Sequence, residues 1–237
     1  MDSIQKKQED QYCKPYHYFI EKNSWTGLFY YSYMQPVINY INSKNGLKIL
    51  DAGCGDGFFE YSVNNKNHIF GVDYSEKAIE FAKIFNNSST SKEFFCQSIE
   101  TTNFPDNYFD VVVNLAVFEH IEPEKCQNVL EEFGRVLKSD GELIMAIPTK
   151  NLSIPKKHYR HFDYNEIELI LKEKNFSIKN YYYVFNKRFN IFFKFIENRF
   201  FRINFLFRHL PKFFNLFFAK ANKDSGLMLL IFCEKLK

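Results

Sequence analysis

The chain has 237 residues, of which 46% are hydrophobic and 25% charged, and its formal net charge is +3. This length can bury a full core, and the charge is too mild to require a nucleic-acid partner. Five scattered cysteines without a C-x-x-C pair argue against a disulfide framework or a zinc site, so we expect no metal and a reducing, cytoplasmic setting. We find no secretory signal pattern, and the longest uncharged apolar stretch, residues 225–233, is far below the ~20 residues that a membrane-spanning helix needs.

The most specific pattern lies at residues 48–57, Lys-Ile-Leu-Asp-Ala-Gly-Cys-Gly-Asp-Gly, where an apolar strand runs into an acid and three alternating glycines. Glycine at positions 53, 55 and 57 lets a ligand approach the backbone and allows the positive φ angles of a tight strand-to-helix turn. A dinucleotide fingerprint would need glycine at position 58, where this chain has Phe58, and would have no need of Asp51. The acid instead favours a cationic ligand.

A second strand is expected over residues 68–73, and it ends at Asp73, 22 residues after Asp51. An acid at this spacing, at the carboxyl end of a strand, can accept hydrogen bonds from both hydroxyls of a ribose. Ser75 is expected to cap a helix over residues 76–85. Residues 48–85 thus resemble the opening of the class I S-adenosylmethionine-dependent methyltransferases, whose first motif is an acid followed by G-x-G-x-G.

Later segments fit the same resemblance in the same order. Residues 103–114 resemble the family's fourth strand with the turn before it, and residues 115–121 resemble the loop after it, where relatives often carry Glu-His. Apolar spacing predicts a helix over residues 123–137, ended by residues 139–141, and a fifth strand over residues 142–148. The resemblance implies an α/β fold within residues 46–237: a Rossmann-like, mostly parallel sheet of seven strands, with helices on both faces and an antiparallel last strand.

The resemblance also implies S-adenosylmethionine as the cofactor and S-adenosylhomocysteine as its product. It assigns cofactor binding to Asp51, Gly53, Gly55, Asp73, Tyr74, Ser98, Ile99, Asn114 and Leu115. Asp73 would bind the ribose and Tyr74 would pack on the adenine. Ser98 departs from the family pattern, because relatives commonly carry Asp there to accept the adenine amino group. A hydroxyl can accept the same hydrogen bond without charge, or Glu100 takes over.

Residues 1–45 are dense in aromatic side chains and have a break near residues 23–27. In the family, an N-terminal helical segment often lies across the cofactor, and aromatic faces attract a sulfonium ion. We therefore expect residues 1–45 to form a helical lid, with Tyr18 and Trp25 as its candidate substrate contacts. Simple packing of these rings on the core is the alternative.

Residues 155–164 bring His158, Arg160 and His161 into one turn, which the resemblance puts on the acceptor side of the sheet. These side chains could bind a carboxylate or a phosphate, or take a proton. The turn fits equally well as the entry to a helix capped by Asp163, which runs to about residue 174 and precedes a strand over residues 176–185.

His120 and His161 are the candidate catalytic residues, as proton acceptors. The loop of His120 faces the transferred methyl group in relatives, and a general base assists methylation of a hydroxyl or a ring carbon. The pair Glu119-His120 also fits the start of a helix, where Glu favours the positive end of the helix dipole.

Residues 188–223 contain twelve phenylalanines, eight Lys or Arg and a single acid, Glu197. The family needs only a turn between its last two strands, so this stretch is interpreted as a helical insertion, with a helix break at residues 209–211. A basic, aromatic amphipathic helix fits an anionic membrane surface or a lipid-linked acceptor, which would place the protein on the inner face of a membrane. Cover for the core or a homodimer contact fits as well.

Together these patterns favour methyl transfer to a small-molecule, lipid-linked or glycan acceptor, with O- or C-methylation before N-methylation. One alternative is a non-catalytic protein that keeps the cofactor fold, and another is a protein or nucleic-acid methyltransferase. Against amino-methylating nucleic-acid enzymes, residues 114–117 read Asn-Leu-Ala-Val instead of Asn/Asp-Pro-Pro-Tyr/Phe. Both a monomer and a homodimer are compatible with the sequence.

Overall fold

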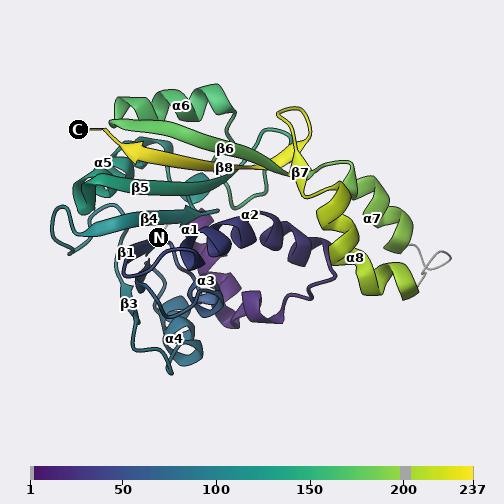
Figure 1. Cartoon of the computed structure of the whole chain (residues 1–237), viewed down its shortest axis with the longest axis horizontal. Coiled ribbons are helices and arrows are strands. Elements are labelled where there is room, and N and C mark those ends of the chain that lie inside the picture. Colours follow the sequence, from purple (N-terminus) through teal and green to yellow (C-terminus); the bar gives the residue numbers. More distant parts are fainter. Residues whose placement is uncertain (1–2, 198–203, 237) are drawn as a thin grey trace.

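A computed structural model describes residues 3–197 and 204–236 (Figure 1). Its strands are β1 (Lys48–Ala52), β2 (His68–Asp73), β3 (Lys92–Cys96), β4 (Phe109–Leu115), β5 (Leu137–Pro148), β6 (Phe176–Asn186), β7 (Lys220–Ala221) and β8 (Gly226–Lys235). The α-helices are α1 (Ser3–Glu9), α2 (Trp25–Asn42), α3 (Phe58–Ser62), α4 (Glu76–Phe85), α5 (Cys126–Val136), α6 (Tyr164–Glu173), α7 (Phe189–Glu197) and α8 (Asn204–Phe217). Short 3-10 turns are η1 (Asp10–Cys13), η2 (Tyr16–Phe19), η3 (Phe118–His120) and η4 (Pro123–Lys125).

The strands form one sheet in the order β3-β2-β1-β4-β5-β8-β6-β7. Strands β1 to β5 pair in parallel, and β8 pairs antiparallel with both β5 and β6. This confirms the predicted Rossmann-like, mostly parallel sheet with an antiparallel last strand. The predicted count of seven strands was wrong by one, because the chain returning from α8 adds β7, which pairs with Tyr183 and Val184 of β6.

Alternate residues of the central strands point to opposite faces, each of which is covered by helices. Leu50 and Val112 pack with α5 and α6 in one buried cluster, whereas Ile49 and Val113 pack with α2 and α3 in the other. Figure 1 shows α6 at the top of the view and α5 at the upper left, with α2 and α3 below them. The β1-to-β4 order places the carboxyl ends of these strands at one edge, where ligands bind in open α/β sheets.

Two predicted boundaries differ from the structure. The fifth strand begins at Leu137 rather than at residue 142, because Leu137 pairs with Phe109 and a register shift precedes the Val111 pair with Glu142. The predicted helix break at residues 209–211 was also wrong, since Pro211 lies inside α8. Leu210 and Phe214, on either side of this proline, are fully buried and anchor the helix across it.

Helices α7 and α8 pack against α2 through an aromatic cluster that includes Leu28, Phe185, Phe189 and Phe214. The Trp25 indole of α2 donates a hydrogen bond to Asn190 Oδ1 at 2.7 Å. Figure 1 shows α7 and α8 extending from the right-hand end of the molecule. Within the described ranges, no helix combines the length and the apolar character needed to cross a membrane.

Candidate functional site

A cavity of about 440 Å³ opens at the carboxyl ends of β1, β2 and β4. Its wall combines the glycine loop after β1, the end of β2, the turn η3 and aromatic side chains of the N-terminal segment. This volume is in the range of small-molecule and cofactor sites, and the position is the one expected for an α/β sheet. It is therefore the candidate functional site.

The glycine loop forms a close-fitting floor in this cavity. Gly53 and Gly55 have φ angles of +96° and +54°, which residues other than glycine rarely adopt. A Cβ at Gly53 would lie 2.4 Å from Val117 Cγ2, and one at Gly55 would lie 2.6 Å from the Tyr12 hydroxyl. Glycine at both positions is thus required by conformation and by space.

Asp73 ends β2 with its carboxylate fixed by two backbone donors. Its Oδ2 accepts from the Gly55 N–H at 3.0 Å and its Oδ1 from the Ser75 N–H at 2.9 Å. Each oxygen keeps a further lone pair, so the carboxylate can still accept from the two hydroxyls of a ribose. Burial raises the pKa of Asp73 to about 6, against the lowering effect of these two hydrogen bonds. The acceptor oxygens of Asp73 and the glycine floor together fit an adenosyl group.

Asp51 lies at the end of β1, lines the same cavity and is almost completely buried. Burial raises the pKa of Asp51 to about 7, while the neighbouring Glu60 carboxyl acts in the opposite direction. Glu60 is fully buried, and burial followed by the Asp51 charge raises its pKa well above the usual range. An ionised Asp51 next to a protonated Glu60 offers one negative charge to a cationic ligand.

These shifts predict a pH dependence of cofactor binding. Both Asp51 and Asp73 have raised pKa values, so lowering the pH through about 7 and then about 6 protonates them. Protonation removes the negative charge that offsets the sulfonium and weakens the carboxyl group as an acceptor for the ribose. Affinity for S-adenosylmethionine should therefore fall as the pH drops from about 8 to about 5, which titration calorimetry can follow. An Asp73→Asn variant should bind weakly and with a smaller pH dependence. A wild-type affinity that stays constant over this range would contradict the assignment.

The structure brings most of the other predicted cofactor residues to the cavity. Tyr74, Ser98, Ile99 and Leu115 line it. Ser98 Oγ accepts a hydrogen bond from the Glu100 N–H at 3.1 Å, and Glu100 itself also lines the cavity.

Asn114 does not line the cavity. It is fully buried, and its side chain donates to the Ala52 carbonyl at 2.8 Å, which ties the end of β4 to β1. The structure thus places Asn114 beneath the glycine loop as a support.

The N-terminal segment contributes wall residues that the sequence did not single out: Tyr12, Tyr16, His17 and Tyr30. Asp56 of the glycine loop also lines the cavity. His17 Nδ1 lies 2.8 Å from Asp56 Oδ1, and the His17 N–H donates to Asp56 Oδ2 at 3.1 Å. Asp56 is fully buried, so this pair clamps the segment on the loop. The only sign of this pair in the sequence was the acid Asp56 between Gly55 and Gly57.

Of the two predicted lid contacts, Trp25 lines the cavity and Tyr18 does not. The Tyr18 ring stacks on Phe85 with centroids 3.9 Å apart, and its hydroxyl donates to the Gly57 carbonyl at 3.2 Å. Tyr18 therefore holds the segment on α4 from outside.

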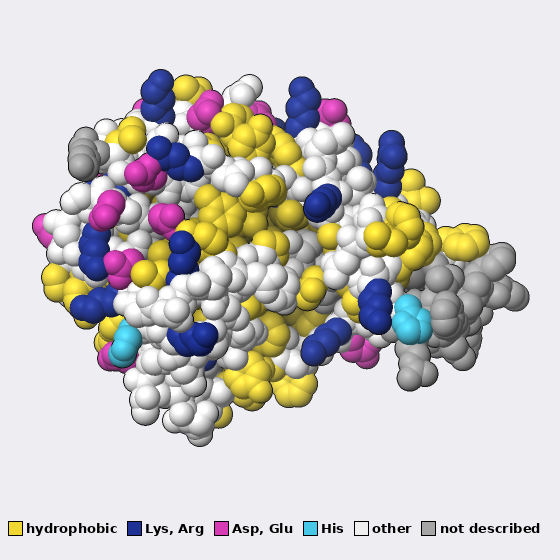
Figure 2. All heavy atoms as spheres, viewed as in Figure 1, with side chains coloured by type: hydrophobic (Ala, Val, Ile, Leu, Met, Phe, Trp, Pro, Cys, Tyr) yellow, Lys and Arg dark blue, Asp and Glu magenta, His cyan; other side chains and the backbone are white. Residues whose placement is uncertain are grey.

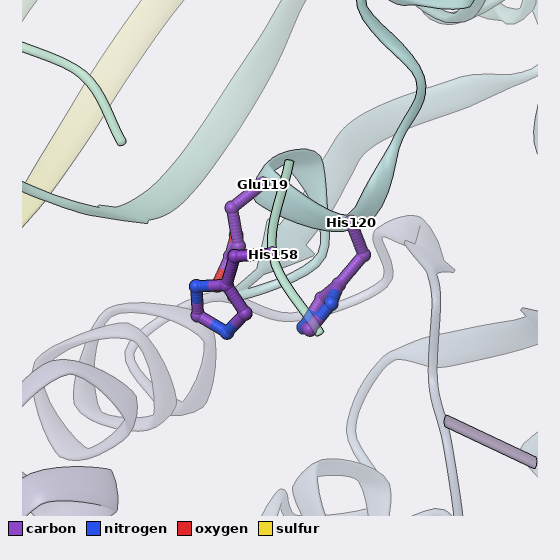
Figure 3. Close-up of side chains that lie close together, drawn as sticks. All are labelled: Glu119, His120 and His158. Atoms are coloured by element: carbon purple, nitrogen blue, oxygen red, sulfur yellow. The ribbon is translucent and has the colours of Figure 1, made fainter. Parts of the chain in front are cut away.

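Another part of the cavity wall gathers Glu119, His120, Lys157 and His158. His120 Nδ1 lies 2.8 Å from the Lys157 carbonyl, which can only accept, so Nδ1 carries the proton and Nε2 has a free lone pair. Burial lowers the pKa of His120 to about 4, and burial likewise raises the pKa of Glu119 to about 8. Figure 3 shows Glu119 and His120 on η3, with His158 on the adjacent loop.

His161 and Arg160 stand behind this group and do not line the cavity. His161 Nδ1 lies 2.9 Å from the Leu152 carbonyl, and its Nε2 lies 2.8 Å from His158 Nδ1. The Arg160 guanidinium lies over the Phe162 ring, 4.6 Å from its centroid. In this position His161 can orient His158 but does not reach a ligand in the cavity.

The sheet order, the glycine loop and the paired acids define a domain of the class I S-adenosylmethionine-dependent methyltransferase fold. Residues 50–145 match the family described as "Methyltransferase domain", so the resemblance inferred from the motifs is confirmed for this part of the chain. A solved S-adenosylmethionine-dependent methyltransferase of Methanosarcina mazei is similar in fold, with a TM-score of 0.60 and 19% identity, covering 85% of this chain and 97% of that one.

Two curated relatives are similar in sequence over part of their length. Phosphoethanolamine N-methyltransferase 1 of Arabidopsis thaliana is 27% identical over 152 residues, which cover 59% of this chain and 30% of the plant protein. The ubiquinone biosynthesis O-methyltransferase of Idiomarina loihiensis is 26% identical over 117 residues, covering 48% of this chain and 47% of the relative. The chain thus spans less than half the length of either relative.

Proposed function

We propose that this protein transfers the methyl group of S-adenosylmethionine to an acceptor bound beside η3. The observation that carries the proposal is the shared cavity: Asp51, Asp73 and the glycine loop line one part of it, and Glu119 and His120 line another. A protein that bound the cofactor without chemistry would have no need of this second, histidine-lined space. The relatives' named activities support methyl transfer as the reaction class.

The bound cofactor supplies an activated methyl group on a sulfonium. The Asp73 carboxylate would hold the ribose, Tyr74 and Ile99 would pack beside the adenine, and Asp51 would offset the positive charge. Rings of Tyr12, Tyr16 and Tyr30 line the cavity and offer aromatic faces that attract a sulfonium ion. Holding two reactants in line can supply ~7–11 kcal/mol of the barrier, so positioning is the main task of these side chains.

The acceptor is proposed to carry a hydroxyl or an acidic ring carbon, so that O- or C-methylation is favoured. A neutral His120 with a bare Nε2 can take the proton that such an acceptor loses, whereas a carboxylate acceptor needs no base. The O-methyltransferase among the relatives is consistent with this choice, while the phosphoethanolamine N-methyltransferase represents the competing N-acceptor. We infer a small-molecule or lipid-linked acceptor, because side chains of the N-terminal segment line the cavity and limit its size.

Transfer itself is tested by incubating the protein with methyl-labelled S-adenosylmethionine and an extract of its source cells. Label in small soluble compounds or in lipid would support the proposal and identify the acceptor class. Label in protein or nucleic acid would replace it with the macromolecular alternative. Cofactor binding without any transfer would favour the non-catalytic interpretation.

We further propose that α7 and α8 contact an anionic membrane surface on the cytoplasmic side, where a lipid-linked acceptor would be found. Ile191 and Leu216 are each 76% exposed, and Phe217 is 57% exposed. Arg188, directly before α7, Lys194 of α7 and Lys212 of α8 are also exposed. Figure 2 shows Lys and Arg beside hydrophobic side chains on the visible face of this end. Exposed apolar side chains with a basic rim fit an interface with anionic lipid.

Vesicle sedimentation tests the membrane surface. Wild-type protein is expected to bind phosphatidylglycerol vesicles in a salt-sensitive manner and phosphatidylcholine vesicles weakly. An Ile191→Ser and Leu216→Ser double variant should bind at least about tenfold more weakly, because each large aliphatic side chain contributes about 1.5–3 kcal/mol when buried. Leu169→Ser is the matched control, since Leu169 is 61% exposed on α6. Vesicle binding by the double variant that equals wild-type binding would reject the membrane proposal. So would conversion of a wild-type dimer to a monomer in the double variant without a change in vesicle binding.

A further inference from the structure

The side chains at the acceptor end of the cavity have the composition of a metal-binding site. Glu119, His120 and His158 each offer one ligand atom, and these atoms all lie within 4.8 Å of one another (Figure 3). We propose that Glu119, His120 and His158 bind a divalent transition metal ion of the zinc class, with its open coordination position facing the cavity. From the sequence we expected no metal, so this proposal replaces that expectation. It also goes beyond the proposed methyl-transfer function.

Both histidines are held in the tautomer that a metal ligand needs. The Lys157 carbonyl fixes the proton of His120 on Nδ1. His161 Nδ1 donates to the Leu152 carbonyl, so neutral His161 accepts through Nε2 and places the proton of His158 on Nδ1. Each of the two cluster histidines therefore keeps a bare Nε2. Metal-bound histidines typically have this arrangement, with the second ring nitrogen donating to a neighbouring oxygen or nitrogen acceptor.

The third ligand is a buried carboxyl group, one oxygen of which lacks a hydrogen-bond partner among the described residues. Glu119 is 2% exposed, and its Oε2 has no hydrogen-bond partner among the described residues. A buried, unpaired polar atom is costly unless a ligand satisfies it. The backbone also holds the two segments together, because the Tyr159 N–H donates to the Glu119 carbonyl at 2.9 Å. The cluster is thus built into the fold on both sides.

The ligand set selects the kind of ion. Two imidazoles and one carboxylate suit Zn²⁺, Fe²⁺ or Co²⁺, whereas Mg²⁺ and Ca²⁺ prefer oxygen ligands. Three protein ligands leave a position for water or for a substrate atom, as in catalytic zinc sites. Ligand distances to such an ion are about 2.0–2.2 Å, so ligand atoms that lie up to 4.8 Å apart would draw closer together when the ion binds.

The positive charge of Lys157 is expected to weaken metal binding, because it interacts with the same Glu119 carboxyl group that would hold the ion. Its Nζ is bound to Gln11 Oε1 at 3.3 Å. If Glu119 serves only as the partner of this lysine, the Lys157→Met variant binds the ion no more tightly than the wild type, or neither protein binds it. If the cluster is a metal site, a Lys157→Met variant binds the ion more tightly than the wild type.

Cobalt titration of the chelator-treated full chain tests the site without cofactor or acceptor. Wild-type protein is expected to bind one Co²⁺, with visible d–d bands that Zn²⁺ abolishes. Glu119→Gln and His158→Gln should each weaken binding at least about hundredfold, and His161→Leu about 10–100-fold through lost orientation of His158. His68→Gln is the matched control and should bind as the wild type does, because His68 is exposed on β2. Circular dichroism checks that each variant is folded.

Three results would overturn the proposal: no d–d bands in the wild type, unchanged affinity in both Glu119→Gln and His158→Gln, or a thiolate-to-cobalt charge-transfer band. The last result would move the ion to an exposed cysteine, Cys13 or Cys96. Because the titration uses neither cofactor nor acceptor, its failure leaves methyl transfer untouched. A bound ion would occupy the same His120 Nε2 that otherwise takes the acceptor's proton.

Discussion

A His120→Ala variant is expected to turn over at least about a hundredfold more slowly than the wild type while its affinity for S-adenosylhomocysteine stays nearly unchanged. The His120 ring lies at the acceptor end of the cavity, and its Nδ1 is committed to the Lys157 carbonyl. Alanine would remove the only free nitrogen of this ring, and general-base assistance of this kind contributes ~10²–10⁴-fold. Initial rates with saturating cofactor, together with calorimetric binding of the product, provide the measurement.

The control for this experiment is His68→Ala, which removes an exposed histidine of β2 and should retain wild-type turnover. Equal turnover in His120→Ala and the wild type would eliminate His120 from the chemistry. A parallel loss of turnover and of product affinity would instead point to a distorted cavity.

An Asp73→Ala variant is expected to bind S-adenosylhomocysteine at least about tenfold more weakly than the wild type. Two charge-assisted hydrogen bonds to the ribose would be lost, each stronger than a neutral one. The Gly55 N–H would also lose its acceptor, so the glycine loop would lose part of its support. Titration calorimetry at about pH 8, where Asp73 is ionised, gives the comparison.

Asp140→Ala is a suitable control for Asp73→Ala, because Asp140 is an exposed acid in β5, remote from the cavity lining. Its affinity should match that of the wild type. An unchanged affinity in Asp73→Ala would show that the ribose lies elsewhere and would remove the basis for orienting the cofactor.

Much of the fold could be predicted because its elements are encoded locally. The short apolar run of β1, the β-branched run of β4 and the apolar spacing of α5 mark elements whose burial is visible within a few neighbouring residues. The glycine loop and Asp73 were equally accessible, since the backbone conformation at Gly53 and Gly55 permits little else. The two-residue strand β7 had no such pattern, because its pairing depends on where α8 returns the chain.

The part of the site that sequence reasoning missed depends on contacts between distant segments. His17 pairs with Asp56 across 39 positions, and neither residue has a periodic pattern that announces the other. The hydrogen-bond chain from Leu152 through His161 to His158 similarly requires the folded loop. Three histidines in the sequence suggested chemistry, but only their geometry separates the two at the cavity from His161 behind them.

Calorimetric titration of the wild-type protein with S-adenosylhomocysteine at about pH 8 tests directly whether the cavity binds a nucleoside cofactor. We expect saturable binding at one site per chain and strong weakening in Gly55→Val, because the valine side chain would meet the Tyr12 hydroxyl and strain a backbone of positive φ. Absence of binding to a folded wild-type protein would contradict the assignment of the cavity to a nucleoside cofactor, and with it the proposed methyl transfer.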